Sequence, residues 1–318
     1  MTTYDQSAAE RARTRQNSLT KPPGSLGRLE DLAVFMAGWQ GRERPRLNHI
    51  QAVVFAGNHG IVAQGVNPFP ASVTAAMVAN FQAGGAAINQ LCRVAGADLS
   101  VRALDLDRPT ADFTQGPAMT PDEVQAAMAQ GAASVDPGTD LLILGEMGIG
   151  NSTVAAVLAA SVFGGAAADW VGPGTGAEGD TLRRKIAAVD AGLARHQPDS
   201  AEATLAAFGG REQAAICGAI LRARELRIPV VLDGFICTAA AAVLTRDDDT
   251  ALDHCLIGHQ SAEPGHRKLI AALGRKPVLE MDMRLGEGSG AALAALILRA
   301  AIECHNGMAT FAEAGISA

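Results

Sequence analysis

The chain has 318 residues, a formal net charge of −7 at pH 7 and only 4% aromatic residues. This acidity, without a lysine- and arginine-rich stripe interleaved with aromatics, argues against a nucleic-acid-binding surface. The sequence contains no amino-terminal apolar signal core and no uninterrupted run of about 18 apolar residues. We therefore expect a cytoplasmic chain without membrane insertion. The five scattered cysteines indicate reduced thiols, not a metal site.

Residues 1–45 are polar and have helical spacing, interrupted by the segment 21–27. After this segment, Leu29, Leu32 and Met36 recur on one helical face. The prolines and glycines of the segment disfavour a continuous helix. The region is predicted to form two helices joined by a turn.

From Ile50 onward, short apolar runs that end in glycine or aspartate alternate with alanine-rich segments of helical length. This alternation is typical of an α/β fold with a mostly parallel sheet. The predicted strands are 52–56, 99–104, 141–144, 230–232, 255–257 and 278–281. The predicted helices are 72–95, 121–133, 152–163, 181–196, 212–225, 236–244, 264–273 and 290–304. In such sheets, ligands bind beyond the carboxyl ends of the strands, which is where the glycines and charged residues of this chain lie.

The strand predicted at 141–144 runs into a glycine-rich turn, 145–150, and then into an alanine-rich helix. Free N–H groups and the positive end of the helix dipole at such a turn favour a phosphate. The turn has neither the Gly-Lys-Ser/Thr of a Walker loop nor the spaced glycines of a dinucleotide fingerprint, and its spacing also suits a tight turn without a ligand. Glu146 favours a site, because an acid beside a phosphate must bind sugar hydroxyls or stabilise developing positive charge.

A second glycine cluster, 172–176, precedes a helix that carries Arg183, Arg184 and Lys185. One interpretation is a flexible loop before a solvated basic face. The other is that the loop amides and one of these cations complete a phosphate-binding site.

Asp233-Gly234 ends one predicted strand, and the segment 258–263 ends the next. An acid followed by glycine at a strand end commonly meets a ligand hydroxyl, although it can instead cap the next helix. His259 and His266 are interpreted as hydrogen-bonding groups, and no metal site is predicted.

The carboxyl-terminal segment 306–317 contains Glu313. Composition alone predicts a frayed tail without a role.

Taken together, an ordered set of motifs covers nearly the whole chain: 21–30 (KPPGSLGRLE), 56–60 (AGNHG), 80–89 (NFQAGGAAIN), 145–151, 233–235 (DGF), 258–263 (GHQSAE) and 311–315 (FAEAG). This set resembles the nicotinate-nucleotide:dimethylbenzimidazole phosphoribosyltransferase family of cobalamin biosynthesis. The resemblance implies a three-layer α/β/α fold with a Rossmann-like sheet in residues 46–300. It also implies a small helical domain made from 1–45 with 301–318, a homodimer, and no cofactor.

The resemblance implies a reaction in which the ribose phosphate of nicotinate mononucleotide moves to a benzimidazole-type base with inversion at C1′. Glu313 matches the family's catalytic carboxylate, which removes the benzimidazole proton, and Glu146 matches a position near the ribose, where it can stabilise positive charge. This role requires the tail to fold back over the ligand-binding edge of the sheet.

The resemblance also implies a set of substrate-binding residues. For the nucleotide these are Gly148, Gly150, Asn151, Gly174, Thr175, Gly176, Lys185, Asp233, Gly234 and Ser261. The apolar slot for the base is predicted from Phe69, Pro70, Met77 and Phe311. Ala76 departs from the glutamine of many family members, which leaves the preferred base open. A neutral exchange that a neighbouring residue compensates explains this alanine equally well.

Two alternatives remain at this stage. Ala76 is the one feature that favours a non-catalytic nucleotide-binding protein. A nicotinamide-dependent dehydrogenase is disfavoured because no Gly-x-Gly-x-x-Gly follows a first strand with an acid about 20 residues later.

Overall fold

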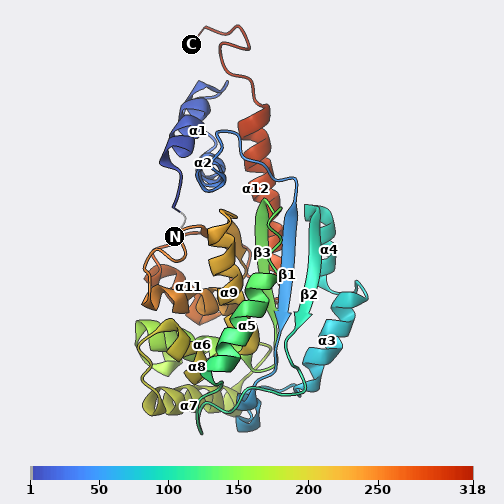
Figure 1. The fold of residues 1–318 in the computed structure, drawn as a ribbon, viewed down its shortest axis with the longest axis vertical. Coiled ribbons are helices and arrows are strands. Elements are labelled where there is room, and N and C mark those ends of the chain that lie inside the picture. Colours follow the sequence, from blue (N-terminus) through green and yellow to red (C-terminus); the bar gives the residue numbers. More distant parts are fainter. Residues whose placement is uncertain (1–2, 318) are drawn as a thin grey trace.

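The computed structural model describes residues 3–317, which form one six-stranded, all-parallel sheet between two layers of helices (Figure 1). The strand order is β2-β1-β3-β4-β5-β6. The strands are β1 Ile50–Ala56, β2 Ala97–Ala103, β3 Leu141–Met147, β4 Val230–Leu232, β5 Cys255–Gln260 and β6 Pro277–Glu280. The chain leaves β1 for β2 and then returns to β3 on the other side of β1, so the strand order reverses between β1 and β3. Ligands of open α/β sheets bind at the carboxyl ends of strands near such a reversal.

The central strands are buried on both faces because apolar side chains alternate between two cores. In β3, Leu142 and Leu144 belong to one core, whereas Leu141 and Ile143 belong to the other. Because successive side chains of a strand point to opposite faces, a run of four apolar residues serves both helical layers. The predicted three-layer α/β/α fold is therefore confirmed, with every strand pair parallel.

Helices cover both faces of the sheet. One face is covered by α5 Pro121–Ala133, α6 Asn151–Phe163, α7 Gly179–Arg195, α8 Ala201–Phe208, α9 Arg211–Glu225, α10 Phe235–Ala242 and α11 Pro264–Ala272. The other face is covered by α2 Arg28–Gln40, α3 Ser72–Gln82, α4 Ala87–Ala95 and α12 Ser289–Gly307. Short 3₁₀ helices occur at Gly60–Gln64, Ala167–Asp169 and Val243–Arg246.

The two ends of the chain meet beyond the amino-terminal ends of the strands (Figure 1). Helix α1, Gln6–Ser18, packs on α2 through Ala9, Ala12, Val34 and Ala37. The backbone of Leu19 forms an isolated antiparallel bridge with Thr310. The domain boundaries at residues 45 and 300 stay a prediction, because α12 runs continuously through the second and α2 shares a core with the sheet.

The predicted elements are present, with three differences. The helix predicted at 72–95 is two helices, because Gly84 adopts a left-handed conformation with φ of 80° between α3 and α4. Helix α8 was not predicted, and the side chain of Ser200 caps it by accepting a hydrogen bond from the Ala203 amide. Strand β3 continues to Met147, so Glu146 lies on the strand and not in the turn after it.

None of the helices within residues 3–317 combines the length and the apolar character that a bilayer crossing requires.

Candidate functional site

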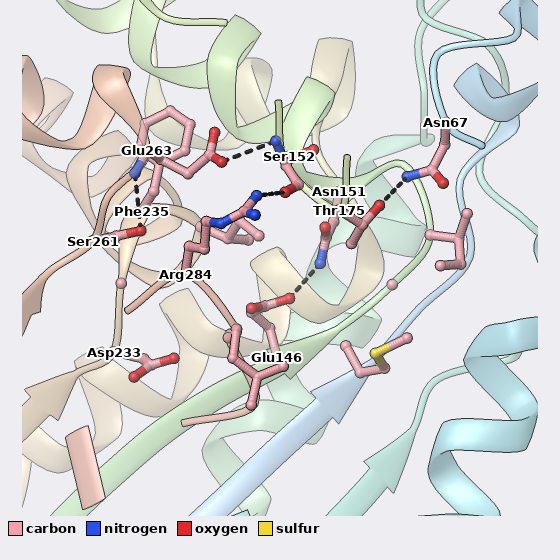
Figure 2. Close-up of a pocket in the computed structure, with 18 of the residues that line it drawn as sticks. Asn67, Glu146, Asn151, Ser152, Thr175, Asp233, Phe235, Ser261, Glu263 and Arg284 are labelled. Atoms are coloured by element: carbon pink, nitrogen blue, oxygen red, sulfur yellow. Dashed lines mark hydrogen bonds between the residues drawn. The ribbon is translucent and has the colours of Figure 1, made fainter. Parts of the chain in front are cut away.

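A pocket opens at the carboxyl ends of β3, β4 and β5, where loops from both halves of the sheet converge (Figure 2). Eight of the predicted site residues line it: Glu146, Gly148, Asn151, Gly174, Thr175, Asp233, Gly234 and Ser261. The two glycine-rich segments and the two strand-end motifs, far apart in the sequence, therefore come together as the sequence predicts.

Glu146 is held on the pocket floor by its position in β3, where its backbone pairs with Phe55 of β1. Its side chain is almost fully buried, and its Oε2 accepts a hydrogen bond from the side-chain amide Nδ2 of Asn151. Burial, followed by the negative charges of Asp233 and Glu212, raises the pKa of Glu146 to about 8. These surroundings therefore keep a proton on this carboxyl at neutral pH, and a positively charged ligand beside it would favour release of that proton.

The opposite corner of the pocket is cationic. Lys185 of α7 is 1% exposed, and its Nζ donates to Gly172 O at 2.7 Å and to Ser152 Oγ at 3.1 Å. Gly174 has a φ of 55°, and a methyl group there would lie 3.3 Å from Lys185 Nζ, so the second glycine loop packs directly on the lysine. Burial lowers the pKa of Lys185 to about 8, and a bound anion would raise it again.

The first turn of α6 faces the same corner. Gly150, with φ of 96°, is the N-cap of this 13-residue helix and provides no side chain to occupy the cap. Asn151 and Ser152 of the first turn line the pocket. The lysine, the helix amino terminus and the loop amides are groups whose chemistry suits a phosphate.

Glu263 and Arg284 complete this corner, although neither was among the predicted site residues. Glu263 Oε1 accepts a hydrogen bond from the Gly174 amide at 2.9 Å, and Arg284 Nη1 donates to Gly174 O at 3.3 Å (Figure 2). Burial raises the pKa of Glu263, while the positive charge of Lys185 lowers it. An incoming phosphate would compete with this carboxylate for the same amide and the same lysine.

Asp233 has a structural role as well as a place in the pocket. Its Oδ2 accepts from the Gly288 amide at 3.1 Å, and its Oδ1 accepts from the Ala291 amide at 3.0 Å. The carboxylate therefore caps α12, which is distant in sequence, and not the helix that follows it. Burial raises the pKa of Asp233 despite these bonds and the nearby His259.

Three of the predicted nucleotide-binding residues, Gly150, Gly176 and Lys185, do not line the pocket themselves. Lys185 lies behind the wall that Ser152 and Gly174 form. Gly176 has a φ of 117° and shapes the loop that carries Thr175. Gly150 makes the turn into α6.

The predicted slot for a flat base is not assembled within one chain. Phe69 is 46% exposed and Pro70 is exposed in the loop before α3, whereas Met77 packs against the core beside the sheet. Phe311 lies at the other end of the molecule, where its amide donates to Ser18 O at 2.9 Å.

The expectation that the tail folds back over this pocket in the same chain is wrong. Helix α12 starts at the pocket and carries the chain away for 19 residues, roughly 28 Å at 1.5 Å per residue. Glu313 is exposed beside Arg15 and Arg44. The carboxyl-terminal segment after α12 lies on the side of the molecule opposite the strand arrowheads (Figure 1). A 19-residue helix cannot bend back, so its direction fixes the position of the tail.

Sequence reasoning also missed a carboxylate close to Glu146. Glu287, in the loop before α12, has a φ of 67° and lies between two glycines that also have positive φ. The run Gly-Glu-Gly-Ser-Gly at 286–290 is the signal that could have identified this loop. Within residues 3–317, no group of three or more His, Cys, Asp or Glu side chains is arranged to hold a metal ion.

A parallel α/β fold with a phosphate corner and buried carboxylates in one pocket defines an enzyme that acts on phosphorylated sugars or nucleotides. The family model described as Phosphoribosyltransferase (DBI_PRT) matches residues 1–316, so the chain belongs to this family. The dehydrogenase alternative is thereby excluded.

Several proteins are similar to this chain over nearly its whole length. The nicotinate-nucleotide–dimethylbenzimidazole phosphoribosyltransferase of Rhodobacter capsulatus is 62% identical over 314 residues, which cover 99% of this chain and 94% of that protein. The enzyme of the same name from Ruegeria pomeroyi is 59% identical, over 98% and 93% of the two chains. The crystal structure of the Thermus thermophilus enzyme of this name matches with a TM-score of 0.92 and 41% identity, over 99% of each chain.

We predict that Glu146→Gln makes the protein more stable at alkaline pH. The pKa of Glu146 is about 8 in the folded chain against an ordinary value of 4.5, so the folded state binds this proton more tightly. The group therefore lowers stability progressively as pH rises from 4.5 to 8. The melting temperature of the variant should exceed that of the wild type above pH 8, and the difference should shrink near pH 5.

Glu303→Gln, on an exposed position of α12, is the matched control and should show no such trend. An equal change in melting temperature for Glu146→Gln at both pH values would contradict the raised pKa of Glu146.

Proposed function

We propose that this chain transfers the ribose 5-phosphate of nicotinate mononucleotide to dimethylbenzimidazole with anomeric inversion, giving α-ribazole 5′-phosphate and nicotinate for the lower ligand of cobalamin. The observation that carries the proposal is a pocket with buried carboxylates on one side and, behind its opposite wall, a buried lysine that donates to the pocket-lining Ser152. This charge separation suits a substrate with an anionic phosphate and a cationic pyridinium. The similarity to enzymes of this name over nearly the whole chain supports it.

In this proposal, Lys185, the Gly174 loop and the first turn of α6 hold the 5′-phosphate. The phosphate would take over the Gly174 amide from Glu263 and restore a full counter-charge to the lysine. Such charge-assisted hydrogen bonds are the strong ones in a buried site. The ribose then extends toward Glu146 and Asp233.

At C1′, one ring nitrogen of dimethylbenzimidazole forms the new bond as the bond to the pyridinium nitrogen breaks. The electron pair of the broken bond goes to the leaving nicotinate, which neutralises its ring. The N–H proton of the attacking base goes to a carboxylate. Positive charge on the ribose in the transition state favours the ionised form of Glu146, which would stabilise it electrostatically.

Glu313 is our candidate for the carboxylate that takes the proton. The Thr310 amide donates to Glu313 Oε2 at 2.7 Å, and the Glu313 amide donates to Thr310 Oγ1 at 3.1 Å. These hydrogen bonds, and the positive charges of Arg15 and Arg44, hold the pKa of Glu313 below its ordinary value. The carboxylate is therefore ionised at neutral pH and ready to act as a base.

Because Glu313 and Phe311 lie far from the pocket of their own chain, the proposed mechanism requires them from a second copy. We propose a homodimer in which residues 1–45 and 301–318 of one protomer cover the pocket of the other. Exposed apolar side chains occur where such a contact would form. Leu285 is 57% exposed at the pocket, Phe69 is 46% exposed two residues after the pocket-lining Asn67, and Ile316 is 52% exposed in the tail.

The same contact would assemble the base slot. Phe69 and Pro70 are exposed in the loop that follows the pocket-lining Asn67, the half-buried Met77 is on the next helix, and Phe311 of a second copy would close the other side of the slot. Ala76 is exposed on α3 beside Met77, where its small side chain widens the slot. The base used in the cell depends on this position.

We predict that Lys185→Met weakens nicotinate mononucleotide binding by about 10- to 100-fold, because a charge-assisted hydrogen bond to phosphate is lost. Arg183→Met is the matched control. This arginine is on the same helix, but its side chain is 73% exposed and pairs with Asp180. Calorimetry should show a loss in the first variant alone; equal losses in both would contradict the phosphate assignment.

The purified protein should release nicotinate from nicotinate mononucleotide when dimethylbenzimidazole is added, and Glu313→Gln should reduce turnover by at least about 100-fold with the fold intact. Glu202→Gln, an exposed change on α8 outside residues 1–45 and 301–318, should leave turnover unchanged.

Absence of nicotinate release at high enzyme concentration, with nucleotide binding retained, would favour the non-catalytic nucleotide-binding protein instead. Wild-type turnover in Glu313→Gln would remove this residue from the mechanism.

A further inference from the structure

A fully buried histidine and glutamate lie behind the pocket floor, and the mechanism above does not use them. His59 follows β1 in the AGNHG segment, and Glu212 is in the first turn of α9. His59 Nε2 lies 3.0 Å from Glu212 Oε1, and both side chains are 0% exposed. Among residues 3–317, neither ring nitrogen and neither carboxylate oxygen has a hydrogen bond of good geometry. Buried polar groups left in this state are unfavourable, so their retention calls for an explanation.

Three glycines make room for this pair. A methyl group at Gly148 would lie 2.9 Å from His59 Nε2, and methyl groups at Gly57 and Gly210 would collide with the Glu212 carboxylate. The backbones that close around the pair come from the ends of β1 and β3 and from the start of α9. This is the place where the strand order reverses, so the pair is built into the sheet edge that carries the pocket.

Glu146, which precedes Gly148 by two residues in the sequence, lies close to this pair. Glu146 is also faced by Asp233 at the end of β4, Glu287 before α12, Cys237 on α10 and the Asn151 amide on α6. His259 lies 3.7 Å from Asp233 Oδ1. Each of the two acids whose negative charge raises the pKa of Glu146 most, Asp233 and Glu212, therefore has an imidazole beside it.

We propose that His59 and Glu212 are positioning residues whose paired charges set the ionisation of Glu146 during ribosyl transfer. The inference rests on the proposed function, because it concerns the carboxylate beside the developing positive charge. Burial is the main cause of the raised pKa of Glu146, and the charge of Glu212 adds to it. In this proposal His59 is the partner and counter-charge of Glu212, so removal of the acid and removal of the imidazole change the field at Glu146 in opposite directions.

The test is the pH dependence of kcat/KM for nicotinate release. Glu212→Gln removes the negative charge, so the acid limb governed by Glu146 should move to lower pH by about half a unit to one unit. His59→Asn leaves Glu212 without its counter-charge, so the same limb should move to higher pH. The double variant should return toward the wild-type profile.

His254→Asn is the control for loss of a buried imidazole, since His254 is 0% exposed and bonds to Ile220 O away from the pocket. It should lower the melting temperature without moving the acid limb. Glu146→Gln should abolish the limb and thereby identify it. If the acid limb of kcat/KM moves in the same direction in Glu212→Gln and His59→Asn, or moves in neither, the inference is overturned.

A second measurement does not require turnover. Calorimetry of nicotinate mononucleotide binding in two buffers of different ionisation enthalpy gives the number of protons released. Below pH 8, Glu212→Gln should release fewer protons than the wild type, because Glu146, whose pKa is about 8 in the wild type, is already more ionised. Unchanged proton release in Glu212→Gln would also overturn the inference, whereas a wild type that binds but does not react would overturn only the proposed function.

Discussion

The buried charges of the pocket are the constraint on which the rest of the structure depends. Lys185 and Glu146 are buried away from water. Burial lowers the pKa of Lys185 and raises the pKa of Glu146, each to about 8, and so favours the neutral form of both side chains. A dipolar ligand would reverse both shifts, because each end of it supplies the missing counter-charge. An anionic phosphate beside Lys185 and a cationic ring beside Glu146 would therefore favour the charged forms that burial disfavours.

The parallel sheet makes this arrangement possible. The carboxyl ends of all six strands lie along one edge of the sheet. Residues more than a hundred positions apart in the sequence therefore line one pocket. Glycines at this edge let backbones close directly on buried side chains, as Gly174 does on Lys185 and Gly148 does on His59. Asp233 links the edge to α12 by capping its amino terminus, which ties the pocket floor to the helix that carries the tail.

The strands and most helices could be predicted from the sequence because each central strand is an apolar run buried on both faces, such as 141–144. The convergence of the glycine-rich turns could also be predicted, since the carboxyl ends of parallel strands share one edge. The split between α3 and α4 depended on the conformation of one glycine, Gly84, within an otherwise helical pattern.

The position of the tail could not be predicted, because it depends on the direction of α12 in space and not on any local pattern. The resemblance to a family identified Glu313 but carried no information about which chain it serves. Groups such as Glu263, Arg284 and Glu212 were missed for a related reason. Each is an ordinary charged residue in the sequence and becomes notable only through its burial or its neighbours.

The central claim is that a pocket of one protomer works with the tail of another, and mixing two impaired variants tests it most directly. Glu313→Gln lacks the base but has an intact pocket, and Lys185→Met has an intact tail but a weakened phosphate site. After unfolding and refolding together, random pairing in a two-fold dimer should restore about a quarter of the wild-type rate at low nucleotide concentration. A mixture no more active than its separate components would contradict the account.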